Sequence, residues 1–155
     1  MNILKPEIRK TLLDKSTKST YPVALKHSAL ETIDSYSPTW IHSYTDGSAF
    51  KATINAGYGS VMHFPDNTKK EVYNSSGSFC SNYIAEQQAI THTANHTNHI
   101  FDTNQGRNTN IVIFTDSLST LDKLESGTDA SKDMIHLIWS LHNLIQRHHI
   151  KVVLQ

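Results

Sequence analysis

The chain has 155 residues, 37% of them hydrophobic, which is enough for one domain with a buried core and some additional chain. Its 14 basic and 14 acidic side chains cancel, so the net charge does not decide whether the partner is rich in phosphate. The single cysteine, Cys80, excludes an internal disulfide and a cysteine-based zinc site, and no apolar run approaches the roughly 20 residues that span a membrane.

Residues 1–39 are polar and rich in Lys, Ser and Thr, and we interpret them as a basic lead-in or linker. Only Val23 to Ile33 has apolar residues at helical spacing, and Pro22 just before it suits a first helical turn. We therefore expect one short helix here, docked loosely on the rest. The first ten residues lack the apolar stretch of a secretory signal, so we expect an intracellular protein.

From Trp40 onward the pattern changes to well-separated strands and helices. The expected elements, in chain order, are strands at Ile41–Phe50, Ala56–Phe64 and Lys69–Ser75, a long helix at Ser81–Phe101, a strand at Ile111–Thr115, helices at Ser117–Leu124 and Asp133–Arg147, and a strand at Ile150–Leu154. The first three strands have short connections, which favours an antiparallel meander, and the later ones alternate with helices, which favours parallel pairing. Residues 40–155 thus predict one α/β domain.

Three carboxylates occupy unusual places in this pattern. Asp46 lies within the first strand and is followed at once by Gly47, while Asp116 follows a buried strand at its carboxyl end, where ligand sites of α/β sheets gather. Glu86 lies in the first turns of the long helix among apolar neighbours. Taken singly, each acid has an ordinary structural explanation: a turn for Asp46, a helix cap for Asp116 and a helix dipole for Glu86.

Taken together, the three acids indicate a metal site. Carboxylates that converge on one point repel each other, and a divalent cation relieves that repulsion. Oxygen ligands without cysteine favour Mg²⁺ or Mn²⁺. Two such ions about 4 Å apart activate water and stabilise the leaving oxygen when a phosphodiester is hydrolysed.

Four short motifs, in order, resemble those of the type 1 ribonuclease H family. They are Tyr44-Thr45-Asp46-Gly47-Ser48, Ala56-Gly57-Tyr58-Gly59, Ser81-Asn82-x-x-Ala85-Glu86 and Phe114-Thr115-Asp116-Ser117. The sequences of these motifs look most like the ribonuclease H domains at the C-terminal side of non-LTR retrotransposon reverse transcriptases. The resemblance covers about residues 40–155.

The resemblance implies a ribonuclease H-like α/β fold, with a five-stranded mixed sheet flanked by helices, and cleavage of the RNA strand of RNA–DNA hybrids. It implies that Asp46, Glu86 and Asp116 are catalytic and ligate two Mg²⁺ ions, with Mn²⁺ as a substitute. It further implies that the backbone of Gly47 and Ser48, together with the side chain of Asn82, contacts the minor groove of the hybrid near the 2′-hydroxyls. A reverse transcriptase module on the same polyprotein is the second partner that the resemblance implies.

The sequence departs from the family pattern at three places. Tyr83 and Leu118 stand where the family often has polar residues that contact the substrate. The family also continues past its fifth strand to a Trp-x-Pro-x-His stretch and a last helix with a fourth acid, whereas this sequence ends at Gln155. We therefore expect a domain incomplete at its C-terminus, with the final helix missing, an apolar sheet face uncovered, and low activity and stability.

Two alternatives follow from these departures and from the ten histidines. The chain could be a catalytically inactive ribonuclease H-fold remnant that only binds nucleic acid or protein. His92, His96 and His99 lie near one face of the long helix, which would also suit a zinc-binding module. No glutamate follows His92 in a His-Glu-x-x-His pattern, so we expect a solvated helix face instead.

Overall fold

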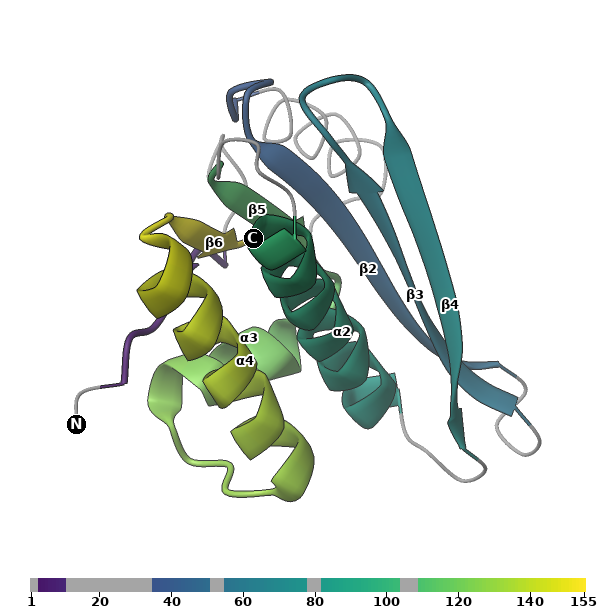
Figure 1. The fold of residues 1–155 in the computed structure, drawn as a ribbon. Coiled ribbons are helices and arrows are strands. Elements are labelled where there is room, and N and C mark those ends of the chain that lie inside the picture. Colours follow the sequence, from purple (N-terminus) through teal and green to yellow (C-terminus); the bar gives the residue numbers. More distant parts are fainter. Residues whose placement is uncertain (1–2, 11–34, 51–54, 78–81, 104–108) are drawn as a thin grey trace.

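The computed structural model describes residues 3–10, 35–50, 55–77, 82–103 and 109–155 (Figure 1). The short helix expected within residues 23–33 lies outside this described part. No helix in the described ranges is long and apolar enough to cross a membrane.

Six strands form one mixed sheet in the order β1-β6-β5-β2-β3-β4. They are β1 (Glu7–Ile8), β2 (Ile41–Phe50), β3 (Asn55–His63), β4 (Lys69–Gly77), β5 (Ile111–Phe114) and β6 (Val152–Leu154). The meander β2-β3-β4 is antiparallel, whereas β5 pairs parallel with both β2 and β6, as the sequence predicted. The sheet has one strand more than the five expected, because β1 joins it from the N-terminal segment.

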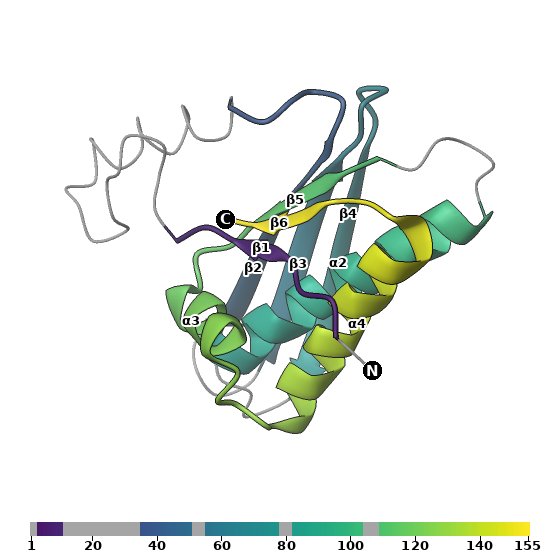
Figure 2. The same cartoon turned by 90° about the vertical axis from the view of Figure 1, so that its left-hand side faces the viewer.

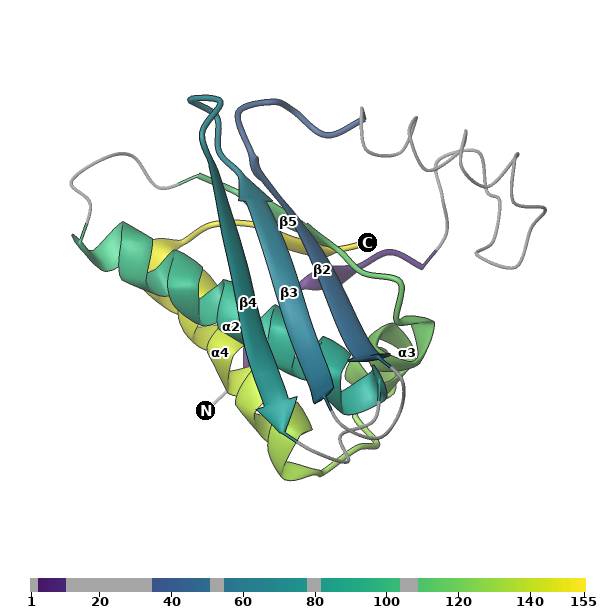
Figure 3. The same ribbon diagram turned by 90° about the vertical axis from the view of Figure 1, so that its right-hand side faces the viewer.

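Three helices in the described part cover one face of the sheet: α2 (Asn82–Thr103), α3 (Leu118–Ser126) and α4 (Lys132–His148). Figure 3 shows the meander in front, with α2 and α4 behind it. The apolar spacing of α4 explains its place, since Leu137, Leu141 and Leu144 fall on one side and are fully buried. Ser131 caps its first turn by accepting a hydrogen bond from the Met134 amide.

The two-residue period of the strands decides what faces these helices. On β2, Ile41 and Ser43 are buried beneath them, whereas His42 between the two is only half-buried. On β5, Ile111 and Ile113 belong to the same core as α2 and α4. Position 45 therefore also faces inward, which matters for the site described below.

The N-terminal segment packs against the rest of the fold at the sheet edge. Glu7 and Ile8 pair in parallel with Val153 and Leu154 of β6, and the Arg9 amide donates to the Leu154 carbonyl at 2.8 Å (Figure 2). Ile8 also packs against the main core. The sequence pattern gave no sign of this strand, because two residues are too few for any alternation. Whether residues 1–39 form a unit separate from residue 40 onward stays a prediction.

A second, smaller core lies on the other face of the sheet. Val112 and Val153 are fully buried there with Tyr36, and Trp40 and Phe114 pack against them. The expectation of an uncovered apolar face is therefore wrong at these positions. Tyr36 supplies part of the cover, since its ring meets that of Phe114 edge-on, with centroids 5.7 Å apart.

Candidate active site

Glu86 is the centre of the site because two strands hold one of its oxygens. Its Oε1 accepts hydrogen bonds from the hydroxyl of Thr45 at 2.8 Å and from that of Thr115 at 2.7 Å. All three residues are buried, with Glu86 only 4% exposed. A buried carboxylate needs such donors in place of water. The two threonines thus fix the carboxylate of α2 at the junction of β2 and β5.

Each of these threonines directly precedes one of the predicted aspartates. Thr45 lies on β2 before Asp46, and Thr115 follows β5 and precedes Asp116. The two strands are parallel neighbours, with Tyr44 in register with Phe114. The parallel ladder ends at this pair, and Asp46 and Asp116 each lie two residues beyond it along the chain. All three predicted acids therefore start from one corner of the fold.

Asp116 is exposed at the carboxyl end of β5 and does not cap the next helix. Ser117 does so instead: its hydroxyl accepts from the Thr120 amide at 3.3 Å, and its own amide donates to the Thr115 hydroxyl at 3.1 Å. The structural alternative for Asp116, a helix cap, is excluded by this geometry. The side chain of Asp116 is instead available to a ligand from solvent.

The remaining predicted residues are placed by their backbone alone. Asp46 pairs with Gly59 of β3 within a continuous ladder, which excludes the turn that was its alternative explanation. Gly47 and Ser48 continue β2 beyond it, opposite Tyr58 and Gly57. Asn82 is the first residue of α2. The side chains of Asp46, Ser48 and Asn82 lie outside what the structure describes, so their expected contacts stay predictions.

The amino end of α2 is tied to the loop between α3 and α4. The hydroxyl of Tyr83 donates to Oδ2 of Asp129 at 2.6 Å. Burial and the neighbouring carboxylate raise the pKa of Tyr83 to about 12, and the hydrogen bond from Tyr83 lowers the pKa of Asp129. Tyr83, which departs from the family pattern, therefore has a structural role in holding the helix that carries Glu86.

The residues described at this corner fit a hard divalent cation. Glu86 and Asp116 offer carboxylate oxygens, the ligand type that Mg²⁺ prefers. The buried Glu86 is held in one orientation by its two hydroxyl donors, as a metal ligand must be. Among the described side chains, no group of three or more His, Cys, Asp and Glu residues is close enough to hold a metal. The side chain of Asp46, the third predicted ligand, lies outside this described part.

The histidines of α2 form a pair rather than a three-residue cluster. The rings of His92 and His96 stack with centroids 6.4 Å apart, and both are half-buried, while His99 is exposed. Burial lowers the pKa of both His92 and His96. The expectation of a solvated face is thus correct only for His99, and the described residues give no third ligand for a zinc site.

Known proteins resemble this chain in fold, whereas no sequence match was found. No family model matches the sequence, and no curated protein matches it either. The structure superposes on ribonuclease H1 from the halophilic archaeon Halobacterium salinarum with a TM-score of 0.56 and 19% identity, over 74% of this chain and 83% of that one. The chain has a ribonuclease H-like fold.

Two further ribonuclease H structures also superpose on this chain. LC11-RNase H1, isolated from compost and solved in complex with an RNA/DNA hybrid, gives a TM-score of 0.58 at 15% identity, over 74% of this chain and 83% of that one. The N-terminal RNase H domain of a Mycobacterium tuberculosis protein gives 0.53 at 18%, over 74% and 78% of the two chains. At such low identity these likenesses establish the ribonuclease H-like fold and leave the activity to be tested.

Sequence reasoning missed Thr45 and Thr115 as residues of the site. A signal was present, since each is a polar residue at an inward-facing position of a predicted strand and each precedes an acid. A buried hydroxyl needs a partner, and a neighbouring carboxylate is a suitable one. Only the position of α2 on the sheet shows that both hydroxyls meet the same oxygen.

Proposed function

We propose that this protein is a metal-dependent endonuclease that hydrolyses the RNA strand of RNA–DNA hybrids. The observation that carries the proposal is the pair of hydrogen bonds by which Thr45 and Thr115 hold Glu86. Asp46 directly follows the first threonine and Asp116 the second, at neighbouring parallel strands. The ribonuclease H-like fold supports it, because LC11-RNase H1 with the same fold was solved with an RNA/DNA hybrid bound.

In this proposal Asp46, Glu86 and Asp116 hold two Mg²⁺ ions, and Mn²⁺ can replace them. The ions, when bound, lower the pKa of a water molecule and stabilise the leaving oxygen of the cleaved phosphodiester. The chain itself supplies orientation: the two threonine hydroxyls keep the carboxylate of Glu86 from rotating, and the exposed Asp116 faces the side from which a phosphate arrives. Fixed geometry is needed because misplacing the ligands slows the reaction strongly.

Substrate contacts complete the proposal. The backbone of Gly47 and Ser48 and the side chain of Asn82 touch the minor groove of the hybrid, near the 2′-hydroxyls of the RNA strand. Asn82 begins the helix that carries Glu86, and Gly47 follows Asp46 on β2, so these contacts lie next to the carboxylates in the chain. Recognition through groove shape and 2′-hydroxyls distinguishes a hybrid from DNA without reading its sequence.

A cleavage assay tests the activity. A labelled RNA–DNA hybrid is incubated with the protein and Mg²⁺, and RNA fragments are followed over time. We expect cleavage that chelation of the metal stops, and that Asp46→Asn or Glu86→Gln abolishes. Asp102→Asn is the matched control, because Asp102 pairs with Arg147 at the far end of α2. Cleavage that survives Asp46→Asn at the parent rate contradicts the proposal.

Metal titration separates the nuclease from an inactive ribonuclease H-fold remnant. Isothermal titration with Mn²⁺ should show binding that Glu86→Gln removes. A folded protein that binds the hybrid but takes up no Mn²⁺ and cleaves nothing is the remnant. We further propose that the domain belongs to a retrotransposon-type polyprotein beside a reverse transcriptase module, and that it acts inside the cell.

A further inference from the structure

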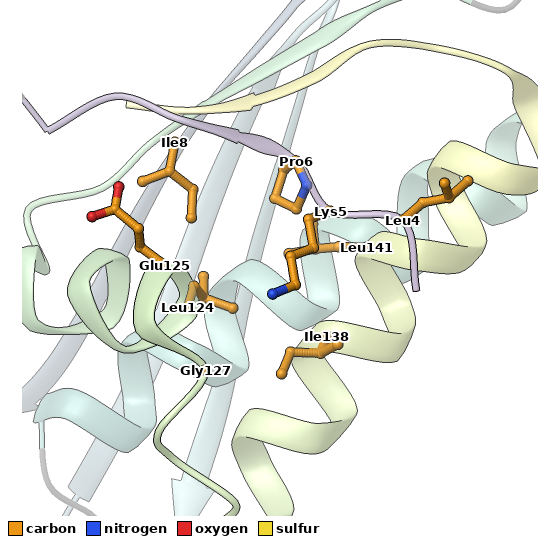
Figure 4. Close-up of a pocket in the computed structure, with 9 residues that line it drawn as sticks. All are labelled: Leu4, Lys5, Pro6, Ile8, Leu124, Glu125, Gly127, Ile138 and Leu141. Atoms are coloured by element: carbon orange, nitrogen blue, oxygen red, sulfur yellow. The ribbon is translucent and has the colours of Figure 1, made fainter. Parts of the chain in front are cut away.

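A cavity lies where the N-terminal segment crosses the groove between α3 and α4 on its way to β1. Its volume is about 250 Å³. Figure 4 shows Ile8 of this segment above the cavity, with Leu124 of α3 on one side and Ile138 of α4 on the other. None of its lining residues belongs to the candidate active site, so a ligand bound here would contact none of the residues of that site.

The floor of the cavity is part of the hydrophobic core. Leu124 is 5% and Leu141 1% exposed, and Ile8 and Ile138 are half-buried around them. Leu4, which is 41% exposed, forms the rim. Water in such a space finds few hydrogen-bonding partners, whereas an apolar molecule gains contacts on several sides. The cavity is therefore suited to a hydrocarbon group.

One cation lines this apolar space. The ammonium group of Lys5 lies between Leu124 and Ile138 in Figure 4, and no ion pair involving it occurs among the described residues. Glu125 also lines the cavity, but its carboxylate is turned away and binds Lys10 at 2.8 Å. An anion placed beside Lys5 would thus meet a positive charge that pairs with no carboxylate in the described part of the chain, next to an apolar wall.

We propose that this cavity binds a small apolar monocarboxylate, such as a medium-chain fatty acid. The carboxylate pairs with the Lys5 ammonium, and the carbon chain lies against Leu124, Ile138 and Leu141. A single lysine suits a single negative charge, whereas a phosphate group would need more donors than the cavity offers. The volume is below the roughly 300–1,000 Å³ of sites for drug-sized ligands, which limits the length of the carbon chain that fits.

Titration with octanoate at neutral pH, followed by amide chemical shifts, tests the proposal. We expect saturable shifts at Gly127 and Ile138, and weaker binding of hexanoate, because each buried methylene tightens binding about fourfold. Lys5→Met should weaken octanoate binding about tenfold or more, since a charge-assisted hydrogen bond is lost. Octanol should bind the parent and Lys5→Met equally.

Two controls make the result decisive. Lys132→Met removes an exposed lysine that does not line the cavity, and it should leave octanoate binding unchanged. Ile138→Trp fills the cavity and should abolish binding; Lys5 is exposed, so its variant decides the question even if the tryptophan variant fails to fold. The proposal is overturned if octanoate causes no saturable shift at Gly127 and Ile138, if octanol binds the parent as tightly as octanoate, or if Lys5→Met binds like the parent.

Discussion

The hydroxyls of Thr45 and Thr115 donate to the same oxygen of Glu86, and this pair of bonds orients the buried carboxylate. Neither threonine can be replaced by an apolar residue of equal shape without removing a donor from a buried carboxylate. Leaving this carboxylate with fewer donors costs more free energy than an average hydrogen bond contributes. The reason is that a buried group cannot form a replacement hydrogen bond with water.

Thr115→Val should therefore lower both stability and activity. We expect a loss of about 1–3 kcal/mol in the free energy of unfolding, since the bond to Glu86 and the bond from the Ser117 amide disappear together. The concentration of Mg²⁺ needed for half-maximal cleavage should rise, because Glu86 loses its orientation. Urea denaturation and a Mg²⁺ titration measure the two effects. Thr115→Ser keeps the hydroxyl and should stay close to the parent; a valine variant as stable as the parent would refute this assignment.

Tyr83 and Asp129 form a second residue-scale contact with a pH signature. The pKa of Tyr83 is raised to about 12 from 10.0, so its contribution to stability is complete below pH 10 and is lost as the pH rises through 12. The pKa of Asp129 is lowered from 3.8, so its contribution is present above that value and is lost as the pH falls through the lowered pKa.

Tyr83→Phe should return the pKa of Asp129 toward its ordinary value, because the hydrogen bond from Tyr83 is the largest cause of the lowering. A carbon-detected NMR titration of the Asp129 carboxyl group measures it. Asp66 is the internal control, since its own lowered pKa comes from Thr68 and should not change. An unchanged Asp129 pKa in the variant would mean that the contact is absent in solution.

At the scale of elements, the N-terminal segment (residues 3–10) packs along the last strand and supports it. Its edge strand β1 pairs with β6, and the side chain of Gln155, which follows β6, makes two further contacts. Its Oε1 accepts from the Tyr36 hydroxyl at 2.7 Å, and its Nε2 donates to the Arg9 carbonyl at 3.3 Å. The Gln155 carbonyl accepts from the Thr115 amide at 3.2 Å. These contacts thus reach Thr115, the residue directly before Asp116.

Ile8→Ala tests how firmly β1 is docked. Ile8 is half-buried against the main core, so we expect a loss of about 1–2 kcal/mol, below the 2–5 kcal/mol typical of fully buried sites. Ile3→Ala is the matched control, because Ile3 is 40% exposed and its replacement should change stability by less than about 0.5 kcal/mol. Equal effects of the two variants in thermal or urea unfolding would show that β1 is not docked in solution.

The molecule as a whole carries balanced charge, and we expect three half-buried histidines to make its stability depend on pH below neutrality. Burial is the largest cause that lowers the pKa of His92, His96 and His148 from 6.5. The unfolded chain therefore binds protons more tightly at these sites than the folded chain does. Their contribution to stability is complete above pH 6.5 and declines as the pH falls from 6.5 toward the lowered values.

We accordingly expect the melting temperature to drop between about pH 7.5 and pH 5.5, before most carboxylates titrate. Replacing His92, His96 and His148 by glutamine together should flatten this slope, as differential scanning calorimetry would measure. Asn143→Gln, which alters an exposed side chain that does not titrate, should leave the slope unchanged. A parent protein whose melting temperature is constant over this range contradicts the prediction.

The sequence alone was enough to locate most of the fold. Alternation and helical spacing predicted β2, β3, β4, α2, β5, α3, α4 and β6 to within a few residues, because those patterns record which side of each element is buried. The motifs also predicted that Glu86 and Asp116 belong to one site. In the structure the hydroxyl of Thr115, the residue before Asp116, donates to Glu86, and the shared catalytic role stays a prediction.

Only the tertiary structure decided what joins distant parts of the chain. The pairing of Glu7 with Val153 and the meeting of Thr45, Glu86 and Thr115 bring together residues that no local period relates. Such contacts depend on how α2 crosses the sheet and on which edge is left open for β1, and both are set by packing of the whole core. Local sequence determines an element through backbone preference and amphipathicity, whereas a site made from three elements exists only once they have packed.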